Sequence, residues 1–301
     1  MLARPRIAPV LRMAQVAQVA HVHDVARQGF GTGTNELYDR ARPSYPAAAL
    51  QFIHSSMSPS QATVIEPGAG TGIFSRLLLQ PPTADYPKFD LKALVGVEPS
   101  AGMREAWDNG MSRIPKDAKP LTLRVVDGGF DDLSQTGLSK GTADAVIIAQ
   151  AWHWCPDHEK ALTEIADYLK PGAPLILIWN LESDSAGLHK SLRETYQPYD
   201  QGSPQYYRML WRSMYETTAY KRLYSPKQEV HFPWEMGMTE DQVVDRVMSK
   251  SYMTMLKGDE RDEAIAQIRQ VIRQSDKEWI DKDNGVFKYR YTTDIVILRK
   301  I

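Results

Sequence analysis

A glycine-rich turn at residues 66–72 carries the clearest chemical signal in the sequence. An apolar run ends at Glu66, Gly68, Gly70 and Gly72 then alternate with other residues, and a helix is expected to begin at Ile73. Glycines at these positions let backbone N–H groups approach a ligand closely, and the N-terminus of the following helix supplies a partial positive charge. The turn therefore predicts a site for a nucleotide-containing cofactor.

Two carboxylates indicate which cofactor this is. Ile73 stands where the dinucleotide pattern G-x-G-x-x-G needs a third small residue. Glu66 would repel a pyrophosphate but suits a ligand that carries ammonium and sulfonium charges. A second apolar run ends at Glu98, where a carboxylate can grip both hydroxyls of a ribose. The sequence thus predicts S-adenosylmethionine. A turn that only packs and a Glu98 that only caps a helix are the alternatives, and an NAD-dependent oxidoreductase ranks last.

Several motifs, in a fixed order, resemble class I S-adenosylmethionine-dependent methyltransferases. They are Glu66–Gly72, Val97–Met103, Ala149–Trp154, Leu169–Gly172 and Ile178–Asn180. The segment at 38–46, Tyr-Asp-Arg-Ala-Arg-Pro-Ser-Tyr-Pro, is similar to one in the trans-aconitate methyltransferase-like (methyltransferase type 11) branch, which acts on small molecules. The resemblance runs from about residue 30 to the C-terminus and weakens beyond residue 180.

The order of elements agrees with this resemblance. Apolar runs that read as strands alternate with helical segments up to residue 179, which predicts a parallel sheet covered on both faces. The resemblance implies an α/β, Rossmann-like sheet of seven strands, mostly parallel with an antiparallel C-terminal strand, and helices on both faces. We expect a disordered extension over residues 1–30 and a single methyltransferase domain over 31–301, with substrate-cap elements around 183–280.

The residues that the resemblance assigns to the cofactor lie before the sheet and at strand ends. They are Tyr38, Arg42, Glu66, Gly68, Ala69, Gly70, Gly72, Glu98, Asp127, Phe130, Asp131 and Gln150. The Phe130 N–H and one of the two aspartates would flank adenine, and because Gly129 replaces a commoner acid, either Asp127 or Asp131 can serve. Tyr38 and Arg42 are expected on a lid, with Arg42 pairing with a carboxylate of the cofactor or of an acidic substrate. The alternative is that both belong to a solvated helix start.

The acceptor site is expected where the fourth strand ends. Methyl transfer is an in-line displacement, so the site must align the acceptor and exclude water. His153 is the candidate catalytic residue, to orient or deprotonate the acceptor, while Trp152 and Trp154 would form walls of the substrate pocket. The alternative is a structural histidine with core tryptophans, and a carboxylate acceptor would need no base. The aromatic stretch at 206–212 is either a cap over this pocket or a packed helix.

Composition limits the classes of partner that we expect the protein to bind. The chain has 301 residues, 43% of them hydrophobic, and a net charge of -1, so a small-molecule acceptor is favoured over a nucleic acid and no membrane span is expected. RNA or protein methylation and non-catalytic cofactor binding remain alternatives. The single Cys155 suits a reducing compartment and leaves the motif from His153 to His158 without a second cluster, so no metal is predicted. We expect a cytoplasmic protein. The acid-free first 23 residues, with arginines, suggest a mitochondrial transit peptide more weakly.

Overall fold

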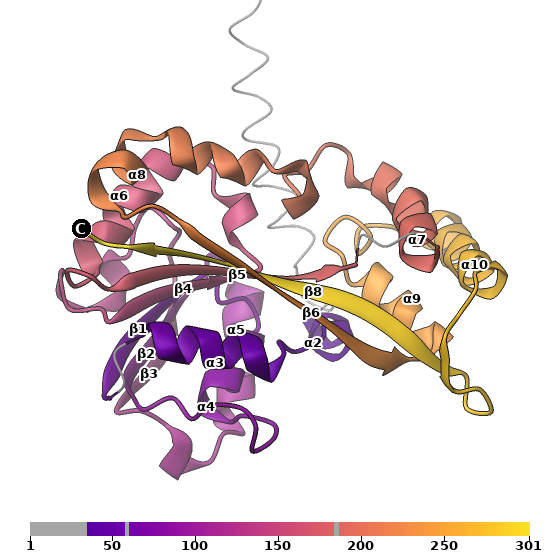
Figure 1. The fold of residues 1–301 in the computed structure, drawn as a ribbon, viewed down its shortest axis with the longest axis horizontal. Coiled ribbons are helices and arrows are strands. Elements are labelled where there is room, and N and C mark those ends of the chain that lie inside the picture. The colour runs from indigo at the N-terminus through magenta and orange to yellow at the C-terminus, as the bar shows by residue number, and fades with distance from the viewer. Residues whose placement is uncertain (1–34, 58–59, 184–186) are drawn as a thin grey trace, which may run out of the picture.

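The computed structural model describes residues 35–57, 60–183 and 187–301 (Figure 1). The disordered extension and the transit peptide predicted for the N-terminus lie outside the described residues. The side chain of Tyr38 lies outside them as well, although its backbone belongs to the helix α2, Asn35–Ala41.

One eight-stranded sheet has the order β3-β2-β1-β4-β5-β8-β6, with β7 paired to β8. The strands are β1 Ala62–Pro67, β2 Leu91–Val97, β3 Thr122–Val126, β4 Ala145–Ala149, β5 Pro174–Glu182, β6 Gln228–Met238, β7 Trp279–Asp281 and β8 Val286–Arg299. The strands β1 to β5 are parallel, whereas β8 is antiparallel to both β5 and β6. The predicted α/β sheet with its antiparallel C-terminal strand is confirmed, but the predicted number of seven strands is wrong.

The short strand β7 was not expected. It has three residues and is joined to β8 by a tight turn, in which Asp281 accepts a hydrogen bond from the N–H of Asn284 at 3.1 Å and Gly285 has a φ of +69°. Asp, Asn and Gly are typical turn residues, so the hairpin has a local signal. Three residues are too short to display the alternation that marks a strand.

The strand order reverses between β1 and β4, where the chain returns from the sheet edge at β3 to the other side of β1. In open sheets of this kind, ligands lie beyond the carboxyl ends of the strands at such a point. The central strands are apolar throughout because both of their faces are buried. Ile148 and Leu177 join the core on one face, while Ile147 and Ile176 join the core on the other.

Helices cover both faces of the parallel part of the sheet (Figure 1). The helices α3, Ala47–Ser56, α4, Ile73–Leu79, and α5, Ala101–Ser112, pack into one core. The helices α6, His158–Tyr168, and α8, Thr218–Leu223, pack into the other. This two-sided covering leaves the carboxyl ends of β1 and β4 as the edge from which loops can build a site.

The long strands β6 and β8 extend beyond this core into a second lobe. There a separate hydrophobic cluster joins them to α7, Leu188–Tyr196, α9, Glu240–Met248, and α10, Gly258–Gln274 (Figure 1). These helices fall in the region predicted to hold substrate-cap elements. Figure 1 shows α2 beside α9, and an ion pair of 2.9 Å between Arg40 and Asp245 links the two helices.

The helix α2 is also tied to the first lobe. Its Asp39 carboxylate accepts hydrogen bonds from the Thr71 hydroxyl at 2.9 Å and from Arg76 at 2.6 Å. The helix α2 therefore contacts both lobes. Within the described part of the chain, no helix combines the length and apolar character that crossing a membrane requires.

Candidate active site

The glycine turn after β1 adopts a backbone that needs glycine. Gly68, Gly70 and Gly72 have φ values of +72°, +55° and +82°, in the left-handed region that side chains disfavour. A Cβ atom on Gly68 would lie 2.5 Å from the Cβ of Ala151. At Gly70, by contrast, a Cβ would meet only the Met103 sulfur, at 3.8 Å. Gly70 therefore presents bare main chain to open space.

That open space is a cavity of about 450 Å³, here called the turn cavity. It is lined by Gly68, Gly70, Glu98, Pro99, Ser100, Met103, Asp127, Gly128, Gly129, Phe130, Asp131, Ala149, Gln150, Ala151, Trp154 and Pro156. Its walls thus come from the loops after β1, β2, β3 and β4. Both Asp127 and Asp131 line it, and Asp127 also pairs with Arg104 at 3.2 Å, so the choice between the two aspartates stays open.

Glu98 is fixed to the glycine turn. Its two carboxylate oxygens accept hydrogen bonds from the N–H of Gly70 at 3.0 Å and of Ser100 at 2.9 Å. The residue is 6% exposed, and burial raises the pKa of its carboxyl. Because each oxygen keeps a second lone pair, the carboxylate can still accept from a ligand in the turn cavity.

Glu66 lies deeper, beside a second cavity of about 50 Å³, here called the small cavity. Its carboxylate accepts a hydrogen bond from the Ser75 hydroxyl, which in turn accepts one from the Trp107 indole at 2.9 Å. Burial raises the pKa of Glu66 to about 8. The ligand-free protein therefore holds a proton on Glu66 at neutral pH, and a cation bound nearby would favour its release.

A third cavity, of about 720 Å³ and here called the large cavity, lies between the two lobes. Cationic, acidic and tyrosine side chains line much of it, namely Arg42, Arg193, Arg246, Lys250, His231, Glu182, Asp294, Tyr196, Tyr206, Tyr207 and Tyr252. Gln150 and Trp154 line both the large cavity and the turn cavity, so these two spaces meet there. The small cavity shares Arg42, Gln150 and Arg246 with the large one.

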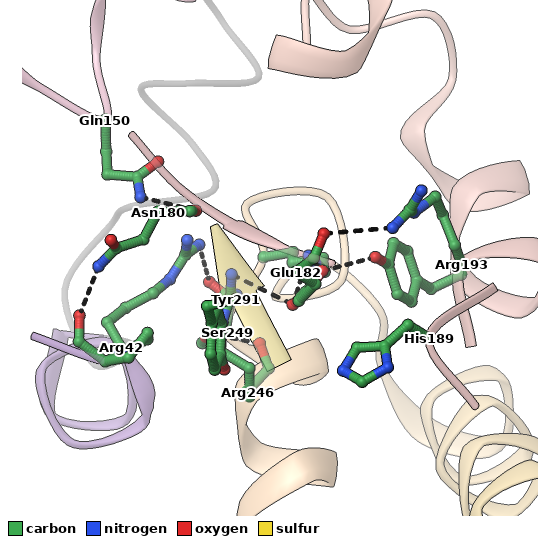
Figure 2. A network of polar contacts seen from close by, with 12 residues as sticks. Arg42, Gln150, Asn180, Glu182, His189, Arg193, Arg246, Ser249 and Tyr291 are labelled. Atoms are coloured by element: carbon green, nitrogen blue, oxygen red, sulfur yellow. Dashed lines mark hydrogen bonds and ion pairs between the residues drawn. The ribbon is translucent and has the colours of Figure 1, made fainter. Parts of the chain in front are cut away.

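Among the described residues, Gln150 is the one that lines all three of these cavities. Its φ is +58°, which is uncommon for a residue other than glycine. Hydrogen bonds from its N–H to the Ile178 carbonyl at 2.8 Å and from its side chain to the Asn180 carbonyl at 3.0 Å hold it in place (Figure 2). Backbone strain of this kind is typical of functional sites.

His153 lines the large cavity. Its Nδ1 accepts a hydrogen bond from the Trp179 indole at 3.2 Å, so the imidazole proton is on Nε2. Burial, aided by the charge of Arg42, lowers the pKa of His153 to about 3. A neutral imidazole with Nδ1 already engaged is a hydrogen-bond donor at Nε2. This favours the predicted orienting role over the predicted deprotonating role.

The two tryptophans differ in position. Trp154 lines the large cavity and the turn cavity, and its place in a substrate pocket stays a prediction. Trp152 is fully buried, packs against Phe130 at a ring distance of 5.7 Å and lines none of the three cavities, so the prediction that it walls the substrate pocket is wrong. The two residues form a 3₁₀ turn, where side chains two positions apart point in different directions.

The end of β5 holds a buried charged cluster that the sequence did not predict. Glu182 lies 3.2 Å from Arg246 and 2.9 Å from Lys250, and it accepts a hydrogen bond from Tyr196 at 2.7 Å; these four residues are called the Glu182 cluster (Figure 2). Although burial alone would raise it, these two cations hold the pKa of Glu182 well below its usual range. One feature of the sequence indicates this cluster. Arg246 falls on the same helical face of α9 as the apolar residues Val243 and Val247.

Comparisons with known proteins identify the part of the chain that builds the turn cavity. Residues 65–177, from β1 into β5, match the family described as the methyltransferase domain. This part of the chain is therefore similar to a methyltransferase domain. An uncharacterized methyltransferase of Mycobacterium tuberculosis is 26% identical over 243 residues, which are 81% of this chain and 85% of that one. One of Schizosaccharomyces pombe is 28% identical over 49% of this chain and 51% of its own.

Two solved structures share the fold of this chain. The YcgJ protein of Bacillus subtilis is 14% identical, has a TM-score of 0.51 and covers 84% of this chain and 98% of its own. A protein of Anaeromyxobacter dehalogenans is 18% identical with a TM-score of 0.53, over 86% and 97% of the two chains. The matched family segment ends in β5, so the Glu182 cluster lies beyond it. Membership in the trans-aconitate branch stays a prediction.

Proposed function

We propose that this protein transfers a methyl group from S-adenosylmethionine to a small organic acid. The observation that carries the proposal is the junction at Gln150 and Trp154. There, a cavity built from a glycine turn and Glu98 meets a larger cavity lined with arginine, lysine and tyrosine. A cofactor held in the first space would present its reactive end to an acceptor held in the second.

The residues around the turn cavity fit the cofactor chemically. Gly70 leaves room for a ligand against its main chain, and the Glu98 carboxylate keeps lone pairs for two ribose hydroxyls. Glu66 lies beside the small cavity, where a cationic amine would favour its ionised form. When bound, S-adenosylmethionine supplies an electrophilic methyl group on a sulfonium. The residues of this chain bind, orient and desolvate the reactants.

The large cavity suits a small anionic acceptor. Its volume of about 720 Å³ lies in the range of small-molecule sites. The guanidinium groups of Arg42 and Arg193 and the ammonium of Lys250 favour a carboxylate, while tyrosines supply flat apolar surface. Because a carboxylate is already ionised at neutral pH, the reaction needs no base. This agrees with a neutral His153 that donates a hydrogen bond and thereby orients the acceptor.

Cofactor binding and turnover test the proposal separately. Isothermal titration should give micromolar affinity for S-adenosylhomocysteine, the demethylated cofactor, and no measurable binding would reject the proposal. Transfer of a labelled methyl group should occur with some members of a panel of mono-, di- and tricarboxylic acids, and not with the corresponding amides. Binding without any transfer would favour a non-catalytic cofactor-binding protein. Transfer to RNA or protein only would favour the macromolecular alternative.

A further inference from the structure

Arg246 has N–H groups that Glu182, with which it forms an ion pair, does not use. It lies on α9, is 3% exposed, and lines both the large cavity and the small cavity. Its Nη2 makes the ion pair with Glu182, at 3.2 Å. Its Nε and Nη1 atoms are buried and make no hydrogen bond of good geometry with the residues that the structure describes, although the Tyr291 hydroxyl interacts with the same guanidinium. A buried N–H group without a partner is costly, particularly in a charged group, so a ligand that accepts from these atoms would bind well.

The charges around Arg246 indicate the sign of that ligand. In the Glu182 cluster, one carboxylate faces two cations, Arg246 and Lys250, so the buried group carries an excess of one positive charge. Burial lowers the pKa of Lys250 to about 7, so Lys250 is partly neutral in the ligand-free protein at neutral pH, and a bound anion would favour its charged form. Arg42, which lines the same two cavities, adds a third positive group. An anion is therefore the ligand that this surface stabilises.

The small cavity limits the size of the anionic group. It holds about 50 Å³, and Glu66 and the glycine turn line it together with Arg246. A space of this size suits a small anionic group such as a carboxylate better than a bulky one. Arginine is also the side chain whose planar N–H groups suit carboxylates best.

We propose that Arg246 binds a ligand carboxylate at the seam between the small and large cavities, through its Nε and Nη1 groups. This inference rests on the proposed function, which offers two sources for the carboxylate. One is the amino-acid end of the cofactor, next to Glu66. The other is the organic acid acceptor in the large cavity. Both have the same chemistry, and the residue lies beyond the segment that matches the methyltransferase family.

The test uses ligands with and without the carboxylate. The variants Arg246→Gln and Arg246→Lys are titrated with S-adenosylhomocysteine and with 5′-methylthioadenosine, which keeps the nucleoside but lacks the amino acid. If the carboxylate belongs to the cofactor, Arg246→Gln lowers the affinity for S-adenosylhomocysteine about 10-fold or more and leaves that for 5′-methylthioadenosine unchanged. Arg246→Lys, which retains the charge, should lose less.

A second arm addresses the acceptor. Citrate is titrated as a carboxylate probe in the presence of S-adenosylhomocysteine. If the carboxylate belongs to the acceptor, Arg246→Gln weakens citrate binding about 10-fold or more while the affinity for S-adenosylhomocysteine stays the same. Unchanged affinity for both ligands in Arg246→Gln overturns the inference. Wild-type protein that fails to bind S-adenosylhomocysteine contradicts the proposed function instead, and the citrate arm still tests Arg246.

A matched control separates binding from folding. Arg269→Gln removes another arginine that contacts α9, through Glu240 at 2.8 Å, but Arg269 lines none of the cavities. It should leave both affinities unchanged at a similar thermal stability. If Arg246→Gln does not fold, a crystal structure of the wild-type protein with S-adenosylhomocysteine and citrate decides the question. A carboxylate within hydrogen-bond distance of Arg246 Nε or Nη1 supports the inference, and its absence there overturns it.

Discussion

The glycine turn after β1 takes its ligand-facing groups from seven consecutive residues, Glu66 to Gly72, whereas the Glu182 cluster takes its groups from β5, α7 and the region of α9. The turn contributes mainly the shape of its main chain, and that shape requires glycine at position 70. The cluster works through side-chain charge held in a buried place. This difference teaches that the shape of the glycine turn is specified locally, while the Glu182 cluster depends on how the two lobes meet.

The substitution with the largest expected effect tests the glycine turn. Gly70→Val should abolish cofactor binding, with a loss of at least about 100-fold, because a branched side chain enters the turn cavity and the φ of +55° resists it. Titration with S-adenosylhomocysteine measures this. Gly172→Val is the control, since Gly172 has a φ of +77° with nothing within 4 Å of its Cβ position. It should lose stability through backbone strain and keep its affinity; a similar loss of binding in both would assign the effect to folding.

Glu66→Gln should change the pH dependence of stability. The wild-type carboxyl keeps its proton in the folded protein up to a pKa of about 8, but an unfolded chain releases it near 4.5, so wild-type stability falls as pH rises between these values. The variant lacks this loss. Urea titrations at pH 5 and pH 9 measure the free energy of unfolding of both proteins. Between these two pH values it should fall by about 2–4 kcal/mol less in the variant than in the wild type. Equal pH slopes for the two proteins would mean that Glu66 is ionised in the ligand-free state.

Glu98→Ala should weaken cofactor binding by roughly 1.5–3 kcal/mol, the scale of hydrogen bonds to charged groups. Calorimetric titration with S-adenosylhomocysteine measures the change. Asp144→Asn is a matched control, because Asp144 also accepts a backbone N–H, from Thr63 at 2.9 Å, and lines none of the cavities. It should lower the melting temperature without changing affinity. If Glu98→Ala binds as the wild type does, the ribose lies elsewhere.

The smallest effect is expected on the acceptor side. His153→Ala should leave cofactor affinity unchanged and lower kcat about 10-fold, through loss of an orienting hydrogen bond. With a pKa of about 3, His153 should contribute no inflection to the kcat profile between pH 5 and pH 8. His54→Ala, on α3 and outside the cavities, serves as the control. An inflection that disappears in His153→Ala would restore the general-base role, and an unchanged kcat would leave His153 as a packing residue.

The sequence allowed the parallel half of the molecule to be predicted because its signals are local. The glycine spacing, Glu98 and the continuous apolar runs each fall within a few residues, and the structure places Gly70 and Glu98 around one cavity. The position of the Trp152 side chain could not be predicted, because its direction depends on a 3₁₀ turn rather than on residue type. The pair of Glu182 and Arg246 could not be predicted, since 64 positions separate the two residues and only the packing of α9 brings them together.

The double attachment of α2 has a consequence for how the two lobes respond to salt. Asp39 fastens this helix to Thr71 in the glycine turn, and Arg40 fastens it to Asp245 on α9. Movement of this helix away from the glycine turn or from α9 requires the corresponding attachment to break. Arg40 and Asp245 are largely exposed, with side chains 70% and 40% accessible, so dissolved salt screens their attraction. Raising the ionic strength should therefore weaken the contact between α2 and α9 more than the contact between α2 and the glycine turn.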